Sequence, residues 1–356
     1  MAGKLKDYME EKLGTLYLEL TSRCNFLCKY CYNDSSIKSH FILPAERIID
    51  TLSLAKAKLG LHTVIFSGGE PMMHPDFVLL CRKASEIGCK IIIYTNGSLI
   101  TDELIKSIAP FYPDFQITLD APLKEINDSY KGKGSFEAIT RGIDVLNKLY
   151  DMDHIVIRCN LTYEMLRSYD MVIEHINSLK KRGVKKVYFS LIEEKGRADK
   201  NTYPSMENDL QELMDFREKV LGLTVRTTMN VDFPFESCYS CPYVEVEDYA
   251  GEYTLHVASD GSVFPCSGLS YTKHVIGNIL NSNIESIYYG DPMEIFVKDA
   301  VKTRDSIAAC QKCSFRHICK KGCISEMEAD TRLFEIICKR RRKEMVRIIR
   351  QNTGVN

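Results

Sequence analysis

The chain has 356 residues, of which 45% are hydrophobic and 27% charged, with a formal net charge of −1 at pH 7. This composition is typical of a soluble globular protein, and so small a net charge provides no field that would attract nucleic acid or a membrane. No apolar run is long enough for a transmembrane helix, and the N-terminus lacks the apolar stretch of a signal peptide. We therefore expect a cytoplasmic protein with no nucleic-acid or membrane partner.

Short β-branched runs alternate with amphipathic stretches from residue 16 to about residue 230. The predicted strands are 16–20, 63–66, 90–94, 115–119, 154–160 and 186–190, and the predicted helices lie near 44–58, 75–87, 101–108, 135–149 and 164–181. This alternation indicates parallel strands joined by crossover helices. Six such units fall short of the eight in a closed barrel, so we predict an α/β fold with a partial, open (β/α)6 barrel.

The pattern changes after Phe233, where short strands, turns and eight cysteines replace the alternation. A charged helical stretch near 205–222 precedes this change. The predicted organisation is an N-terminal extension over 1–15, the partial barrel over 16–230, a small cysteine-rich domain over 231–345 and a basic tail over 346–356. The tail is either a docking site for an acidic peptide or a solvated helix with one packed face, and the second is favoured.

The chain contains 14 cysteines, and a disulfide framework would suit a short secreted domain better than this one. Cys24, Cys28 and Cys31 follow the first predicted strand directly, at the mouth of the sheet where active sites of such folds lie. Thiolates hold iron–sulfur clusters, usually in fours, so three thiolates on a four-iron cluster would leave one iron open. The alternative is a zinc site completed by a distant Cys or His. Lone cysteines fit buried packing better, and these are Cys81, Cys89 and Cys159.

The spacing CxxxCxxC, with Tyr30 before the third cysteine, resembles that of the radical S-adenosylmethionine (SAM) superfamily. Further segments follow successive strands in the order of that family, namely SGGEP (67–71), YTNG (94–97), ITLDAP (117–122) and EEKGRA (193–198). The resemblance implies a cluster on Cys24, Cys28 and Cys31 that binds SAM and cleaves it reductively to a 5′-deoxyadenosyl radical. That radical abstracts hydrogen from a substrate. The resemblance also implies a reductant such as flavodoxin or ferredoxin.

The same resemblance supplies the expected SAM contacts. Gly68 and Gly69 lack side chains, which allows backbone to approach a ligand closely. Thr118 takes the place of a family serine that binds the methionyl carboxylate, and Leu191 offers backbone groups to the adenine. Arg158 and Asn160 would contact carboxylate or ribose, although a salt bridge or a strand-end polar contact is an equally good interpretation. The full expected set is Tyr30, Ser67, Gly68, Gly69, Glu70, Pro71, Thr95, Asn96, Thr118, Asp120, Arg158, Asn160 and Leu191.

The C-terminal cysteines resemble those of a SPASM domain, an appendage of radical enzymes that modify peptides and proteins. The matching elements are G-x4-C at Gly261 and Cys266, C-x2-C-x5-C-x3-C at Cys310, Cys313, Cys319 and Cys323, and a closing Cys338. The resemblance implies two auxiliary clusters, hence three [4Fe-4S] clusters in all. The first would use Cys238, Cys241, Cys266 and Cys323, and the second Cys310, Cys313, Cys319 and Cys338. An unusually long interval after Cys241 leaves open whether Cys238 and Cys241 both bind. Structural zinc sites are the alternative.

The SPASM resemblance also implies a polypeptide substrate, commonly a ribosomally synthesised precursor peptide. Thioether formation, carbon–carbon crosslinking, epimerisation and decarboxylation all remain open, and no general acid or base is apparent. Residues 1–15 are too few for a leader-peptide recognition domain, so such a module would be a separate protein or dispensable. Ser267 follows Cys266 where sulfatase-maturing relatives commonly have an aspartate, which weighs against that chemistry. The alternatives are a radical SAM dehydrogenase or isomerase of a small molecule and a non-catalytic iron–sulfur protein.

Overall fold

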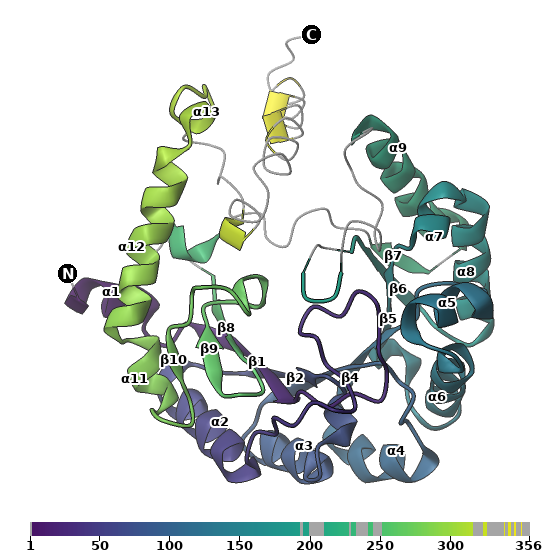
Figure 1. Cartoon of the computed structure of the whole chain (residues 1–356), viewed down its shortest axis with the longest axis horizontal. Helices are drawn as coiled ribbons and strands as arrows, with labels where there is room; N and C mark the ends of the chain where they lie inside the picture. The colour runs from purple at the N-terminus through teal and green to yellow at the C-terminus, as the bar shows by residue number, and fades with distance from the viewer. Residues whose placement is uncertain are drawn as a thin grey trace.

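The fold is seen in a computed structural model of the chain (Figure 1). It describes residues 2–192, 195–198, 210–227, 229–232, 241–244, 251–315 and 323–325, together with positions 338, 341, 342, 345, 346 and 350. Within these residues, no helix combines the length and the apolar character that are needed to cross a bilayer.

The described strands form one ten-stranded sheet in the order β10-β9-β8-β1-β2-β3-β4-β5-β6-β7. Strands β1 to β6 follow the chain order and pair in parallel, which confirms the predicted six-unit partial barrel. Their bounds are β1 Leu13–Thr21, β2 Thr63–Gly68, β3 Lys90–Thr95, β4 Asp114–Thr118, β5 Ile155–Asn160 and β6 Lys186–Ser190. These strands form an arc in Figure 1, and the loop after β1, coloured purple, lies on its inner side.

The crossover helices lie on the outer side of the arc (Figure 1). The helices up to β6 are α1 Ala2–Met9, α2 Ala45–Leu59, α3 Phe77–Glu86, α4 Asp102–Ile108, α5 Lys124–Lys131, α6 Ser135–Leu149, α7 Tyr163–Arg167 and α8 Tyr169–Lys181. The predicted helix over 164–181 is therefore two helices. The division falls at Ser168, whose side chain accepts a hydrogen bond from Met171 N and so caps α8. The sequence pattern did not predict α5.

Side chains alternate between two faces along each strand. On β1, Leu16, Leu18 and Leu20 are wholly buried in the hydrophobic core. The intervening residues, Tyr17 and Glu19, lie on the opposite face. At β1, the inner side of the arc therefore carries polar and aromatic side chains, whereas the leucines pack on the side covered by helices.

The C-terminal region extends the same sheet at its β1 edge. Strand β8 pairs in parallel with β1, and β9 and β10 follow in antiparallel fashion. At the other edge, β7 pairs with β6. The remaining elements are α9 Leu210–Leu221, α10 Leu223–Thr227, β7 Asn230–Asp232, β8 Tyr253–Val257, β9 Ser262–Phe264, β10 Gly277–Asn278, α11 Ile284–Tyr288, α12 Asp291–Ser306 and α13 Ala308–Gln311. The division near residue 230 stays a prediction, since the strands continue across it.

A buried ion pair joins the barrel to the C-terminal region. Glu19 on β1 and His256 on β8 are both 0% exposed, and Glu19 Oε1 lies 3.1 Å from His256 Nε2. The hydroxyls of Tyr32 and Tyr271 also donate to the Glu19 carboxylate. Burial alone would raise the pKa of Glu19, but these partners, His256 first, hold it below its ordinary value. Tyr17 stacks on the His256 ring at a centroid distance of 4.7 Å.

Replacing Glu19 by Ala should destabilise the protein strongly, because it leaves the buried His256 without its acidic partner and two tyrosine hydroxyls without their acceptor. Breaking a buried pair in this way removes about 3–5 kcal/mol from the free energy of unfolding. Glu252→Ala is a matched control, since Glu252 pairs with His62 at 2.7 Å while both side chains are about half exposed. Its loss should amount to less than about 1 kcal/mol. Chemical denaturation of both variants checks this, and equal effects would contradict it.

Candidate functional site

The loop that carries Cys24 is held against the glycine-rich segment after β2. Gly69 N donates to Thr21 O at 2.7 Å, and Glu70 N donates to Arg23 O at 2.8 Å. A Cβ on Gly69 would lie well inside 3.0 Å of the Arg23 carbonyl, and one on Gly68 would meet the Thr21 carbonyl equally closely. These two glycines therefore allow their own backbone to lie close against the cysteine loop. The sequence interpretation, that these glycines also allow backbone to approach a ligand closely, stays a prediction.

Replacing Gly69 by Ala should consequently displace the cysteine loop. The added methyl group meets backbone, which cannot swing aside as a flexible side chain would. We expect loss of most of the iron held by Cys24, Cys28 and Cys31 and a parallel loss of SAM cleavage. Gly134→Ala is the control, because nothing lies within 4 Å of a Cβ there, so this variant bears the strain of a positive φ (+84°) without any clash. Full iron content in Gly69→Ala would show that the loop tolerates the shift.

Glu70 connects the glycine-rich segment to the end of β3. Its Oε1 accepts a hydrogen bond from Thr95 Oγ1 at 2.7 Å, and its Oε2 accepts one from Asn96 N at 2.8 Å. Asn96 Nδ2 lies 3.9 Å from Cys24 Sγ. Burial raises the pKa of Glu70 to about 7 in spite of these donors. The SGGEP and YTNG segments therefore meet beside the cysteine loop.

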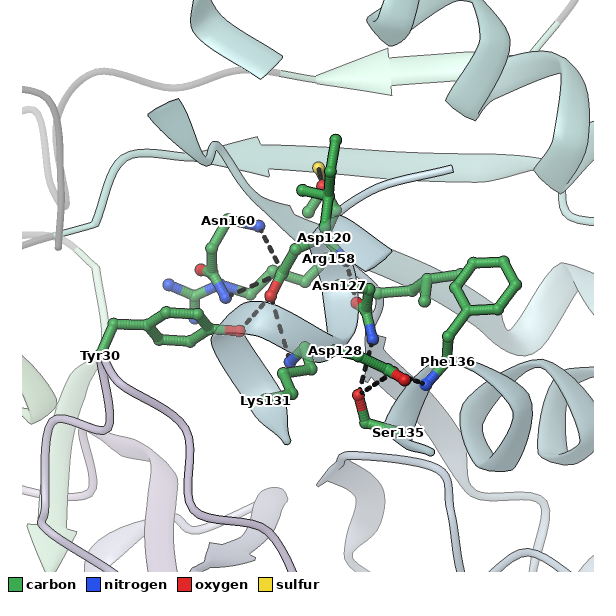
Figure 2. A network of polar contacts seen from close by, with 12 residues as sticks. Tyr30, Asp120, Asn127, Asp128, Lys131, Ser135, Phe136, Arg158 and Asn160 are labelled. Carbon is green, nitrogen blue, oxygen red and sulfur yellow. Dashed lines mark hydrogen bonds and ion pairs between the residues drawn. The ribbon is translucent and has the colours of Figure 1, made fainter. Parts of the chain in front are cut away.

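Asp120, directly after β4, is wholly buried at the centre of a polar network (Figure 2). Its Oδ1 accepts from the backbone and side-chain nitrogens of Asn160 at 2.9 and 3.3 Å. Its Oδ2 accepts from the Tyr30 hydroxyl and lies 3.3 Å from Lys131 Nζ, which is also buried. The Asp120 carboxylate thus receives protein donors on both oxygens and ties Tyr30, in the cysteine loop, to β5. Lys131 comes from α5, the helix that the sequence pattern missed.

The ends of β4, β5 and β6 bring together the other expected SAM contacts. Thr118 is the register partner of Arg158, and Arg158 Nε donates to Asn160 Oδ1 and Ser190 Oγ, both at 3.1 Å. Leu191 follows Ser190 directly. Among the described residues no carboxylate forms an ion pair with Arg158, so the salt-bridge interpretation finds no support there. The other two predicted positions lie on β2 and after it: Ser67, on β2, accepts a hydrogen bond from the Tyr17 hydroxyl, and Pro71 begins a 3-10 turn over Pro71–Met73.

The Cys24, Cys28 and Cys31 thiols influence one another electrostatically. Burial, followed by the Glu70 carboxylate, raises the pKa of Cys24 to about 12, and the Cys28 and Cys31 thiols add to the shift. Three such thiols from one loop match the donor chemistry of an iron–sulfur cluster with one open iron. In the part of the chain that the structure describes, no three His, Cys, Asp or Glu side chains close around a single metal ion.

The described C-terminal thiols fall into the two predicted groups. Burial, and then the neighbouring Cys323 and Cys266 thiols, raises the pKa of Cys241 to about 12. A hydrogen bond to Cys313, together with the nearby Cys338 and Cys310 thiols, raises the pKa of Arg342. The first trio belongs to the predicted first auxiliary set and the second trio to the other set. Cys238 and Cys319, the fourth member of each set, lie outside the described residues, as does most of the basic tail.

Two known families match parts of the chain. The Radical SAM superfamily matches residues 18–172, and an iron–sulfur cluster-binding domain, SPASM, matches residues 249–314. Residues 18–172 therefore form a radical SAM domain and residues 249–314 a SPASM domain, as the sequence motifs predicted.

Individual relatives cover different parts of the chain. Mycofactocin maturase MftC of Mycolicibacterium smegmatis is 25% identical over 86% of this chain and 77% of its own length. The AdoMet-dependent heme synthase of Methanosarcina barkeri is 29% identical, but over only 44% of this chain and 48% of its own length. The crystal structure of Streptococcus suis SuiB bound to S-adenosylmethionine is 20% identical, covers 92% of this chain and 77% of SuiB, and superposes with a TM-score of 0.71. The SuiB likeness establishes the fold.

Proposed function

We propose that this protein cleaves SAM reductively and uses the resulting radical to abstract hydrogen from a ribosomally synthesised precursor peptide. The observation that carries the proposal is the continuity of one sheet, in which the three-cysteine loop follows β1 and the auxiliary cysteines lie on either side of the neighbouring strand β8 in the sequence. When bound, the iron–sulfur cluster and SAM supply the 5′-deoxyadenosyl radical. Cys24, Cys28 and Cys31 hold that cluster. The site already contains the polar side chains that a charged cofactor needs.

The SAM contacts that we propose are spread over the ends of successive strands. Glu70, oriented by Thr95 and Asn96, faces the amino group of the methionyl moiety. Thr118 and Arg158 supply a hydroxyl and a guanidinium for its carboxylate. Ser67, Gly68, Gly69, Pro71, Asn160 and Leu191 complete the binding segment. Asp120 and Tyr30 act by positioning, because the Asp120 carboxylate is occupied by protein donors, one of which is the Tyr30 hydroxyl.

The two C-terminal cysteine sets would each hold an auxiliary [4Fe-4S] cluster, which gives three clusters in all. The grouping of Cys241, Cys266 and Cys323 apart from Cys310, Cys313 and Cys338 supports this division. Flavodoxin or ferredoxin would supply the electron.

A peptide substrate is favoured by the relatives that align over the greater part of the chain. MftC is named a maturase, and SuiB has been crystallised with its precursor peptide SuiA. A second candidate, a tetrapyrrole substrate, follows from the heme synthase. That relative matches less than half of the chain, so it supports the radical chemistry more than the choice of substrate.

The test is anaerobic incubation of the reduced protein and SAM with short peptides encoded beside its gene, followed by mass spectrometry. Loss of 2 Da from the peptide would indicate a crosslink or thioether. Epimerisation would leave the peptide mass unchanged in ordinary water but would add deuterium when the reaction is run in deuterated water. A larger loss would indicate decarboxylation. Turnover of an iron porphyrin, with none of the peptides altered, would instead support the second candidate.

A further inference from the structure

The short segment after β6 lies against the cysteine loop, and neither of its described polar side chains has been given a role. Gly196 has φ +62°, and a Cβ on it would meet the carbonyl oxygens of Cys31 and Tyr32 well inside 3.0 Å. The next residue, Arg197, donates its backbone N–H to Cys31 O at 2.9 Å. Glu193 and Glu194, the first residues of this EEKGRA motif, lie outside the described residues.

The Arg197 side chain fastens the same loop at two further points. Its Nε donates to Cys28 O at 2.9 Å, and its Nη1 pairs with Asp34 Oδ1 at 2.7 Å. Together with the backbone contact to Cys31, these bonds hold both ends of the turn between the second and third cysteines. Arginine suits this task because its guanidinium presents five donors in a fixed, planar arrangement.

One nitrogen of Arg197 remains without a partner. Nη2 is buried and forms no hydrogen bond to any described residue. A buried donor without an acceptor is unfavourable by about 1–3 kcal/mol, more for a charged group, so its persistence indicates an anionic group that completes the site.

The residue before Gly196 contacts the other cysteine region. Lys195 Nζ donates to Gly268 O at 3.1 Å, in the turn that follows Cys266. Residues 195 and 197 thus contact the C-terminal turn and the cysteine loop respectively.

We propose that Arg197 is a positioning residue of the radical-generating site. It fixes the Cys28–Cys31 turn, and its unpaired N–H group donates to the iron–sulfur group that these thiols hold, which raises the reduction potential of that group. Hydrogen bonds to sulfur and nearby charge are among the factors that set such potentials. The inference rests on the iron–sulfur part of the proposed function and does not depend on the substrate.

The experiment compares the reconstituted full-length protein with Arg197→Gln and Arg197→Lys. Arg182→Gln is the control, because Arg182 pairs with Asp144 between helices on the outside of the arc. Two quantities are measured without substrate. The first is the midpoint reduction potential of one cluster, followed by its EPR signal. The signal used is the one that changes when SAM is added, because SAM binds to the cluster with an open iron. The second is the rate at which a chelator removes iron.

In Arg197→Gln, the ratio of reduced to oxidised cluster, measured at the wild-type midpoint potential, should fall about tenfold. For a one-electron couple, this is a midpoint potential lower by about 59 mV. Iron should also leave faster. Arg197→Lys keeps the charge but loses the planar donor arrangement, so it should release iron quickly with a smaller shift in potential. A wild-type midpoint in both variants would overturn the proposal, as would iron release no faster than in Arg182→Gln.

If Arg197→Gln retains no cluster, the lysine variant decides the question alone. Failure of the proposed function would look different. A wild-type protein without iron, or with iron but no SAM cleavage, would refute the function before any variant is compared. A protein that binds its clusters normally yet modifies no peptide would leave the Arg197 result interpretable.

Discussion

Simultaneous replacement of Cys24, Cys28 and Cys31 by Ala should remove about four irons from a wild-type total of about twelve and abolish SAM cleavage. Each cluster of this type carries four irons, and these three thiols are the proposed protein ligands of one of them. Iron analysis and the yield of 5′-deoxyadenosine under strong reductant measure the two effects. The loss of cleavage should be complete, because the two auxiliary sets have no open iron in the proposed arrangement.

The matched control is the triple variant Cys81→Ala, Cys89→Ala and Cys159→Ala. These three cysteines are buried within the barrel and belong to none of the three predicted cluster sets. The control should keep its iron and its cleavage activity, although it will be somewhat less stable. Wild-type protein with stoichiometric zinc and little iron would contradict the account, as would unchanged iron in the first triple variant.

Replacing Cys313 by Ala should separate the radical step from product formation. Cys313, like Cys310 and Cys338, lies near Arg342. It is far along the chain from the cysteine loop. Cleavage of SAM without substrate needs only the cluster at Cys24, Cys28 and Cys31, so it should remain largely intact. Formation of modified peptide should drop at least tenfold.

The measurement is a double readout on a soluble, monodisperse preparation. The yield of 5′-deoxyadenosine without substrate is compared with the amount of modified peptide in its presence. Metal binding is often part of folding free energy, so thermal unfolding of the variant must be recorded alongside. Equal loss of both products in a well-folded variant would mean that the auxiliary cluster is coupled to the radical step itself.

The periodic elements of the barrel were predictable from local sequence. The strand 186–190 and the helix 135–149 have the predicted bounds, because alternation and helical periodicity are both strong there. α5 was not predicted, since Lys124–Lys131 has few apolar residues. Its Lys131 is nevertheless buried against Asp120, a contact that only the tertiary structure creates.

Contacts between residues far apart in the chain were the other feature that could not be predicted from the sequence. Glu19 occupies an alternate position of a strand, which would ordinarily be open to solvent. It is buried because Tyr32 and Tyr271 cover it and His256 pairs with it from a strand 237 residues further along the chain. Arg197 belongs to a motif that was recognised, yet its contacts to Cys28 and Cys31 depend on the folded cysteine loop. Its position directly after Gly196 was the available signal in the sequence.

Transfer of deuterium from a labelled substrate to 5′-deoxyadenosine tests the central claim most directly. A precursor peptide that the protein modifies would be prepared with deuterium at each carbon position of one residue at a time. The account predicts that one labelled residue, the modified one, gives 5′-deoxyadenosine enriched by a single deuterium, and that the Cys24, Cys28 and Cys31 triple variant gives none. Modified peptide together with unlabelled 5′-deoxyadenosine from every labelled residue would contradict it.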